Sequence, residues 1–132
     1  MKNDPTDHEL EFLLAFDGRL HWLKGGYWLK FEIRRTAATV KRPHGLRYSF
    51  TLHAPDGTRL IGFDNAHRVK TRKGHPPVAD HWHRTADDEG QPYDFRGAAA
   101  LINDFFDAVD RVLKDRGESG EVVRIEDRKE QR

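Results

Sequence analysis

Two stretches of the chain alternate between apolar and polar residues, and this pattern constrains the fold more than any other feature. In residues 27–35 and again in residues 47–53, every second residue is apolar. A period of two is that of a β-strand with one buried face. The turn signal Pro55-Asp56-Gly57 separates the second stretch from the strand-like residues 59–63, so we predict a β-hairpin there. The side chains expected to face the core are Tyr27, Leu29, Phe31, Ile33, Tyr48, Phe50 and Leu52.

Three shorter segments also have the composition of ordered structure. Glu9–Phe16 is apolar enough for a strand or a short helix, and its periodicity does not decide between them. Arg19–Leu23 lies between the turn signals Asp17-Gly18 and Gly25-Gly26 and is predicted to be a short strand. Asp80–Arg84 is predicted to form another strand.

One long amphipathic helix is predicted near the C-terminus. Asp107–Arg111 and Asp110–Lys114 are pairs of opposite charge four residues apart, which favour a helix, and Gly117 ends it. The fold class is therefore α+β: an antiparallel sheet of hairpins or a meander, with the long helix packed on one face. The apolar residues at helical spacing are Ala98, Leu101, Ile102, Phe105, Phe106, Val109, Val112 and Leu113.

The length and composition indicate one domain. A chain of 132 residues suits a single core, which we assign to residues 9–117. We expect residues 1–8 to be disordered and the charged residues 118–132 to form a flexible tail. The absence of cysteine excludes disulfides and thiolate zinc sites. No apolar run approaches the length of a membrane span and the first residues hold no apolar signal core, so we expect a cytoplasmic protein without a membrane partner.

The charge is distributed unevenly along the chain. Residues 33–84 contain eleven Lys/Arg and three Asp/Glu, whereas the whole chain has a net charge of only +1. Folding can bring oppositely charged segments together and cancel this asymmetry. Alternatively, it produces a basic face that binds a phosphate-bearing partner. The uncovered face of the predicted sheet would present a platform of Lys30, Arg34, Arg47, Ser49 and Thr51.

The block Gly62–His67 ends the hairpin with side chains suited to chemistry. His67 can act as a general acid or base near neutral pH. Asp64 can orient it, and Asn65 can supply an uncharged donor. The alternative is that Asp64 and Asn65 only cap the strand through bonds from side chain to backbone.

A second block, Asp80–Arg84, contains two histidines separated by one residue. On a strand His81 and His83 point to one face and Trp82 to the other. The pair could bind a metal with Asp64 or Asp80, but no extended metal motif accompanies it, so we assign no metal ligands and no cofactor. Metal-independent RNA cleavage needs a base, an acid and cations for the phosphorane charge. The candidate catalytic residues are therefore His67, His81, His83, Asp64, Arg84 and Arg47.

Basic and polar residues around these blocks are assigned to binding and support. Tyr93 either hydrogen-bonds into the site or anchors the start of the helix, and with Asn65 and Asp80 it is a supporting residue. The basic run 68–73 either grips phosphates or is simply solvated. No P-loop, dinucleotide fingerprint, serine-hydrolase elbow or kinase signature is present. The candidate nucleic-acid-binding residues are Lys41, Arg42, His44, Arg68, Lys70, Arg72 and Lys73.

Six ordered blocks of the sequence resemble the TumE family of bacterial toxin components, over about residues 16–116. The resemblance implies the toxin half of a type II toxin–antitoxin pair, held inactive by an antitoxin with a helix-turn-helix DNA-binding domain. It implies no catalytic residue, and it leaves open a homodimer or a hetero-oligomer with the antitoxin. The blocks are residues 42–49 (RPHGLRYS), 52–57 (LHAPDG), 62–67 (GFDNAH), 80–84 (DHWHR), 92–95 (PYDF) and 104–109 (DFFDAV).

Three hypotheses for the activity follow. The first is an endoribonuclease toxin that uses histidine acid–base chemistry in a basic cleft. The second is a non-catalytic toxin or binding module that occupies nucleic acid or the translation machinery, in which loop charges matter more than histidines. The third is a metal-dependent hydrolase or nucleotidyl-modifying enzyme using Asp64, His81 and His83.

Overall fold

An antiparallel sheet of seven strands and two α-helices form the part of the chain that the structure describes. The computed structural model describes residues 5–38, 45–65, 80–83 and 91–131. Within these ranges the strands pair in the order β6-β5-β4-β3-β2-β1-β7, and every pair is antiparallel. The α+β prediction is therefore confirmed. In chain order the elements are α1 (Pro5–Leu14), β1 (Arg19–Leu23), β2 (Trp28–Arg35), β3 (Leu46–His53), β4 (Arg59–Asp64), β5 (His81–His83), β6 (Gln91–Pro92), α2 (Ala98–Asp115), β7 (Val122–Asp127) and the 3₁₀ helix η1 (Arg128–Gln131).

The centre of the sheet follows the alternation in the sequence. Strands β2 and β3 pair along their whole length, from Trp28 opposite His53 to Arg35 opposite Leu46. The predicted hairpin joins β3 to β4, and Gly57 supplies the positive φ of 91° that its turn requires. All seven side chains predicted to face the core from these strands and the preceding turn are buried. The alternation therefore identified the buried face correctly.

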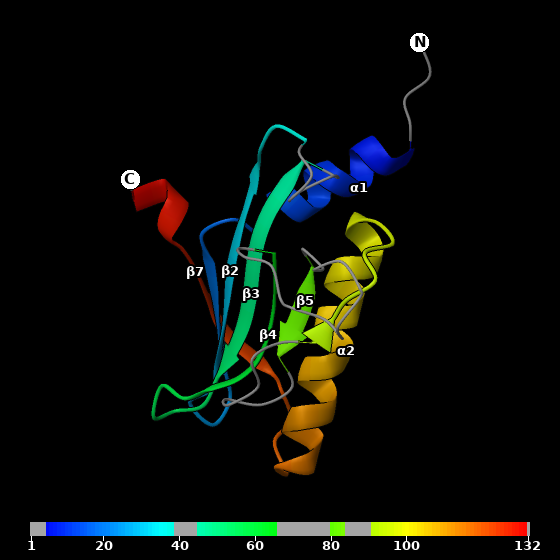
Figure 1. The fold of residues 1–132 in the computed structure, drawn as a ribbon. Coiled ribbons are helices and arrows are strands. Elements are labelled where there is room, and N and C mark those ends of the chain that lie inside the picture. Colours follow the sequence, from blue (N-terminus) through cyan, green and yellow to red (C-terminus); the bar gives the residue numbers. More distant parts are fainter. Residues whose placement is uncertain (1–4, 39–44, 66–79, 84–90, 132) are drawn as a thin grey trace.

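The two helices cover one face of the sheet. Figure 1 shows α2 lying along that face, with α1 crossing near one end of it. The ring of Phe105 from α2 lies 5.7 Å from Phe31, 5.6 Å from Phe50 and 5.8 Å from Phe63, measured between centroids. These contacts join the long helix to β2, β3 and β4, and they form the centre of the hydrophobic core.

The N-terminal prediction is wrong for part of its range. Residues 5–8, expected to be disordered, belong to α1, which starts at Pro5 and continues to Leu14. Proline suits the first position of a helix because its fixed φ is already helical and its missing N–H has no partner there. The helix is fixed by burial of Leu13, which is fully enclosed. The segment Glu9–Phe16, for which strand and helix were both open, is thus largely helical.

The C-terminal prediction is also wrong. Residues 118–132 were expected to be a flexible tail, but Val122–Asp127 form β7, which pairs with β1. The Arg128 N–H then donates a hydrogen bond of 2.8 Å to the Gly18 carbonyl. The high charge of the segment concealed three β-forming residues, Val122, Val123 and Ile125, and β1 offers an edge for them to pair with.

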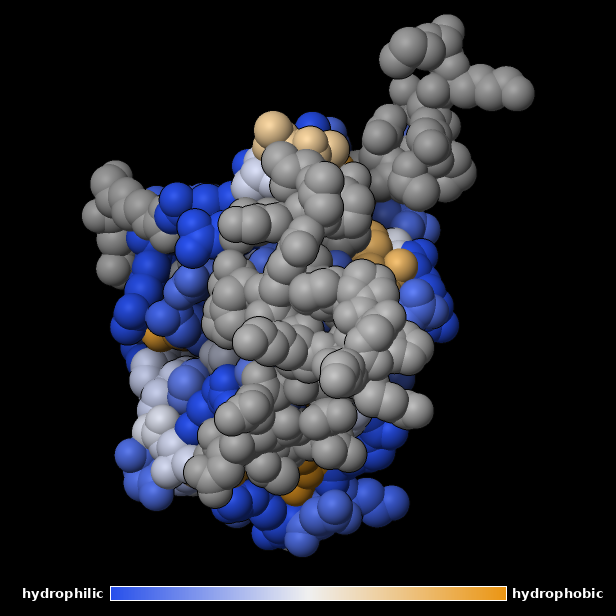
Figure 2. All heavy atoms as spheres, viewed as in Figure 1, coloured by the Kyte–Doolittle hydropathy of each residue, from blue (hydrophilic) through white to orange (hydrophobic). Residues whose placement is uncertain are grey.

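The described surface is predominantly hydrophilic in the view of Figure 2, with small apolar areas between the charged side chains. Within the described ranges, none of the helices combines the length and the apolar character needed to cross a membrane.

Candidate functional site

The polar face of the sheet, opposite α1 and α2, gathers side chains from four strands. Residues paired across neighbouring strands lie on the same face, about 5 Å apart. Strand register therefore aligns residues far apart in the sequence into rows. One row is Lys30, Thr51, Gly62 and His83; the next is Glu32, Ser49, Asp64 and His81; the third is Arg34 and Arg47.

A histidine–carboxylate pair lies at the β4–β5 side of this face. His83 Nε2 is 3.0 Å from Asp64 Oδ2. His83 is only 5% exposed, and the Asp64 side chain is 13% exposed. A buried carboxylate fixes the orientation of an imidazole, and when Nε2 carries the proton, Nδ1 is the acceptor. The pair has the arrangement of a base held by an orienting carboxylate.

A cationic cavity lies beside this pair. Its volume is about 500 Å³, and its lining includes five Arg or Lys residues against two carboxylates. The Lys30 ammonium contacts the Glu32 carboxylate at 3.0 Å, so part of this charge is neutralised locally. Ser49, in the lining, is the strand partner of Asp64, which places the cavity and the pair on neighbouring strands. The charged residues of the lining are Arg19, Lys30, Arg34, Arg47, Arg128, Asp17 and Glu32.

Asn65 fastens the end of β4 to β3. Its side-chain oxygen accepts a hydrogen bond from the Tyr48 N–H at 3.0 Å, and its Nδ2 donates to the Leu46 carbonyl at 2.7 Å. Both bonds are buried, so the side-chain amide continues the ladder where β4 ends. This geometry corresponds to the strand-capping interpretation of Asn65.

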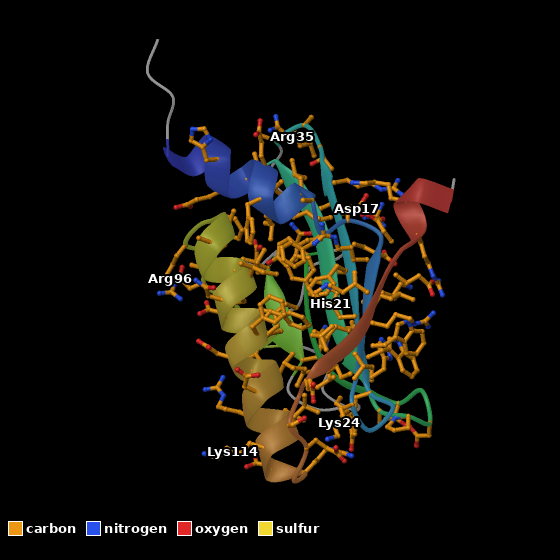
Figure 3. The ribbon with its side chains drawn as sticks, turned by 180° about the vertical axis from the view of Figure 1, so that it is seen from behind. Asp17, His21, Lys24, Arg35, Arg96 and Lys114 are labelled. Carbon is orange, nitrogen blue, oxygen red and sulfur yellow. The ribbon has the colours of Figure 1, made fainter. Side chains whose placement is uncertain are left out.

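Asp80 and Tyr93 connect the buried side of β3 to α2. The Tyr48 hydroxyl donates to Asp80 Oδ2 at 2.5 Å, and burial, followed by the charge of Asp80, raises the pKa of this phenol. The Tyr93 N–H donates to the Asp80 carbonyl at 3.0 Å. The Tyr93 hydroxyl donates to Asp104 Oδ2 of α2, which Arg96 also contacts. Arg96 lies just before the start of this helix (Figure 3). Tyr93 thus has the contacts of an anchor for the helix.

The candidate residues fall into two groups. Strand pairing brings Asp64, His83 and Arg47 to one face, from β4, β5 and β3 respectively. The backbone of His81 pairs with Asp64, but its side chain is not described. In the described ranges no group of three His, Cys, Asp or Glu is arranged to hold a metal ion. Outside the described residues lie Lys41, Arg42, His44, His67, Arg68, Lys70, Arg72, Lys73 and Arg84.

The structure adds residues to the site that the sequence did not identify. Arg128 and Asp17 line the cavity, although Arg128 belongs to the predicted tail and Asp17 was interpreted only as a turn residue. Next to the cavity, the rings of Trp22, Trp28 and His53 form a row across β1, β2 and β3. The Trp28 and His53 rings are stacked at 4.9 Å. No local pattern signals these residues, because their proximity depends on strand order.

A protein-family model matches most of the chain. The family described as Toxin TumE matches residues 7–113 of the 132. The match includes strands β1 to β6 and most of helices α1 and α2, and β7 with η1 lies beyond it. No curated protein and no solved structure matches the chain.

Proposed function

The chain belongs to the TumE family of toxins, and from that premise we propose that it inhibits growth by cleaving RNA without a metal ion. The observation that supports this chemistry is the contact of 3.0 Å between His83 and Asp64 beside a cationic cavity. Transesterification of RNA requires proton transfer and stabilisation of phosphate charge, which an oriented imidazole and arginines can supply.

In the proposed reaction His83 accepts the proton of a ribose 2′-hydroxyl while Asp64 holds the ring. The 2′-oxygen attacks the adjacent phosphorus, and the bond to the 5′-oxygen breaks. A second group donates a proton to that oxygen, leaving a 2′,3′-cyclic phosphate and a 5′-hydroxyl. His67 or His81 is the proposed acid, and Arg47 and Arg84 are proposed to stabilise the charge on the phosphorane.

The cavity is proposed to hold the RNA backbone on either side of the cleaved bond. Its lining has three more positive than negative groups among the charged residues named above. Arg34 and Arg47 pair directly across β2 and β3, and both line the cavity. Phosphate contacts of this kind position a nucleic acid without reading its sequence. The basic residues 68–73 are proposed to extend this contact.

Family membership also leads us to infer a cognate antitoxin as protein partner. We propose that it has a DNA-binding domain and that it blocks the polar face in the complex. Mixing purified antitoxin with the toxin should then suppress RNA binding and toxicity together. Suppression of toxicity with RNA binding unchanged would contradict a block at this face.

The decisive experiment compares RNA 5′ ends after brief induction in a bacterial host. The wild-type chain should create new ends at a shared motif, and His83→Ala and Asp64→Asn should not. His21→Leu, which replaces a buried histidine outside the site, is the matched control and should create the same ends as wild type. The thermal stability of each variant must be measured, so that loss of folding is not mistaken for loss of chemistry.

Other outcomes would replace the proposal. Growth arrest by wild type without new ends would exclude a ribonuclease. If charge reversal at Arg34 and Arg47 then abolished toxicity while His83→Ala retained it, the toxin would act by occupancy. Cleavage that is lost with a chelator and restored by a divalent ion would instead indicate the metal-dependent alternative.

A further inference from the structure

Strand β7 forms an edge of the sheet and exposes apolar side chains. It ends the strand order β6-β5-β4-β3-β2-β1-β7, at the edge of the sheet opposite β6 (Figure 1). Val122, Val123 and Ile125 are 45%, 61% and 55% exposed. An edge strand with exposed apolar side chains is a template for pairing with another strand.

The pairing of β7 with β1 determines which backbone N–H and C=O groups of β7 point toward the outer edge of the sheet. The Arg128 N–H bonds to the Gly18 carbonyl, so this residue pair is hydrogen-bonded. Hydrogen-bonded and non-hydrogen-bonded pairs alternate along an antiparallel ladder. His21 opposite Ile125 lies three pairs further along and is therefore a non-hydrogen-bonded pair. The N–H and C=O of Ile125 consequently point away from β1, toward the outer edge.

We propose that a second copy of this chain pairs with β7 in antiparallel fashion, about a two-fold axis at Ile125. The charges of Arg124 and Glu126 on β7 favour a second copy as the partner and favour one alignment of the two strands. With Ile125 opposite its own copy, each Arg124 lies opposite Glu126 of the second copy. With Arg124 opposite its own copy, two like charges would face each other, which destabilises a sheet. The strand is therefore self-complementary when Ile125 lies opposite its own copy.

The same register suits the backbone and the apolar side chains. Ile125 can exchange two hydrogen bonds with its copy, because its outer groups point to the partner. Cross-strand contact would also cover the two exposed Ile125 side chains. Such an interface is isologous, since the same strand contributes both halves.

Pairing at β7 would have a consequence for the polar face. The two-fold axis of an antiparallel strand pair is perpendicular to the sheet, so the polar faces of both copies lie on the same side. Arg128, which follows β7 directly, lines the cationic cavity. The dimer would thus present two cavities on one continuous face. The interface itself does not depend on the proposed RNA cleavage.

Sedimentation velocity on the purified full chain tests the interface. Wild type should sediment as a dimer, at twice the 15.3 kDa mass of one chain. Arg124→Glu alone and Glu126→Arg alone should each be monomeric, because each places like charges opposite one another twice. An equimolar mixture of the two variants should recover the dimer, since both cross-strand pairs are then of opposite charge.

A backbone variant separates edge pairing from side-chain effects. Ile125→Pro removes an N–H that β7 does not use within the monomer, so the folded monomer should persist while the dimer is lost. Ile125→Val is the matched control and should remain dimeric. The proposal would be overturned if the wild-type chain were monomeric at every concentration. It would also be overturned if the chain formed a complex only after antitoxin is added. A dimer that neither charge variant disrupts would likewise overturn it.

Discussion

Two buried histidines lie on opposite sides of the same sheet and have opposite surroundings. His83, on β5, is 5% exposed and contacts the Asp64 carboxylate on the polar face. His21, on β1, is 7% exposed and lies on the helix-covered face, 4.8 Å from Phe31 and 6.0 Å from Phe16 between ring centroids (Figure 3). Among the residues that the structure describes, neither ring nitrogen of His21 has a hydrogen-bond partner.

The difference teaches that burial of a polar group does not by itself indicate a site. Burial, and then the charge of Arg19, lower the pKa of His21, so the ring remains neutral among aromatic side chains. No described acceptor orients this ring, and it lies on the face of the sheet that the helices cover. His83 has an orienting carboxylate and a cationic cavity on the neighbouring strands. Partners and location, rather than burial, distinguish the two.

The largest expected difference between the two histidines is in activity. His83→Ala should reduce the rate of RNA cleavage about a hundredfold or more, because it removes a proton-transfer group. His21→Leu should leave the rate within about twofold, since ordinary core contacts are retained. The rates are measured with purified protein on a fluorescent RNA, at matched folded fractions determined by circular dichroism. Equal losses in both variants would remove the functional distinction between the two regions.

The next largest effect is on stability, and it compares a buried polar side chain that has hydrogen bonds, Asn65, with one that has none described, His21. Asn65→Ala should lower the free energy of unfolding by roughly 2–4 kcal/mol, because two buried backbone groups, Tyr48 N–H and Leu46 C=O, lose their partner. Urea unfolding monitored by tryptophan fluorescence measures this change. A loss below about 0.5 kcal/mol would mean that water replaces the amide, as at a surface position.

His21→Leu should have the opposite sign. It removes two buried nitrogen atoms that have no partner in the described part of the chain, and it should raise the free energy of unfolding by about 1–2 kcal/mol. The comparison with Asn65→Ala uses the same urea titration. A destabilised His21→Leu variant would show that the aromatic contacts of the imidazole outweigh its desolvation.

The pH dependence of stability gives a finer test of His21. Because its pKa is lowered in the folded state from 6.5, the unfolded chain binds a proton more readily as pH falls below that value. Wild type should therefore lose stability from about pH 6.5 down to the folded pKa, and His21→Leu should lose less. His53, whose pKa burial also lowers, contributes in the same direction to both proteins. If the free energy of unfolding changed with pH in the same way in wild type and in His21→Leu, the pH dependence could not be assigned to His21.

The smallest expected effect on stability belongs to the cavity. Arg47→Ala should change the free energy of unfolding by less than about 0.5 kcal/mol, because the side chain is exposed. It should weaken RNA binding and reduce the slope of log affinity against log salt by about 0.7, as expected for one lost contact to a single strand. Filter binding at several salt concentrations measures both. An unchanged slope would remove Arg47 from the RNA path.

Several elements could be predicted from the sequence because their signals are local. The alternation around Phe31 and Phe50 identifies a buried face from residues two positions apart, and the turn at Gly57 identifies the hairpin. The long helix is likewise identified by its own apolar spacing and by Gly117 after its end. Charge content misled the prediction at the C-terminus, because pairing of β7 depends on the distant strand β1.

The sequence by itself determined the strand faces, the hairpin, the long helix and the basic character of residues 33–84. Only the tertiary structure decided that His83 pairs with Asp64, that His21 is buried without a hydrogen-bond partner in the described ranges, and that Arg128 lines the cavity. The physical reason is the sequence separation of the interacting residues, because periodicity in the sequence reflects interactions between residues that are close in the chain. Contacts between strands depend on strand order and register, which the whole core decides.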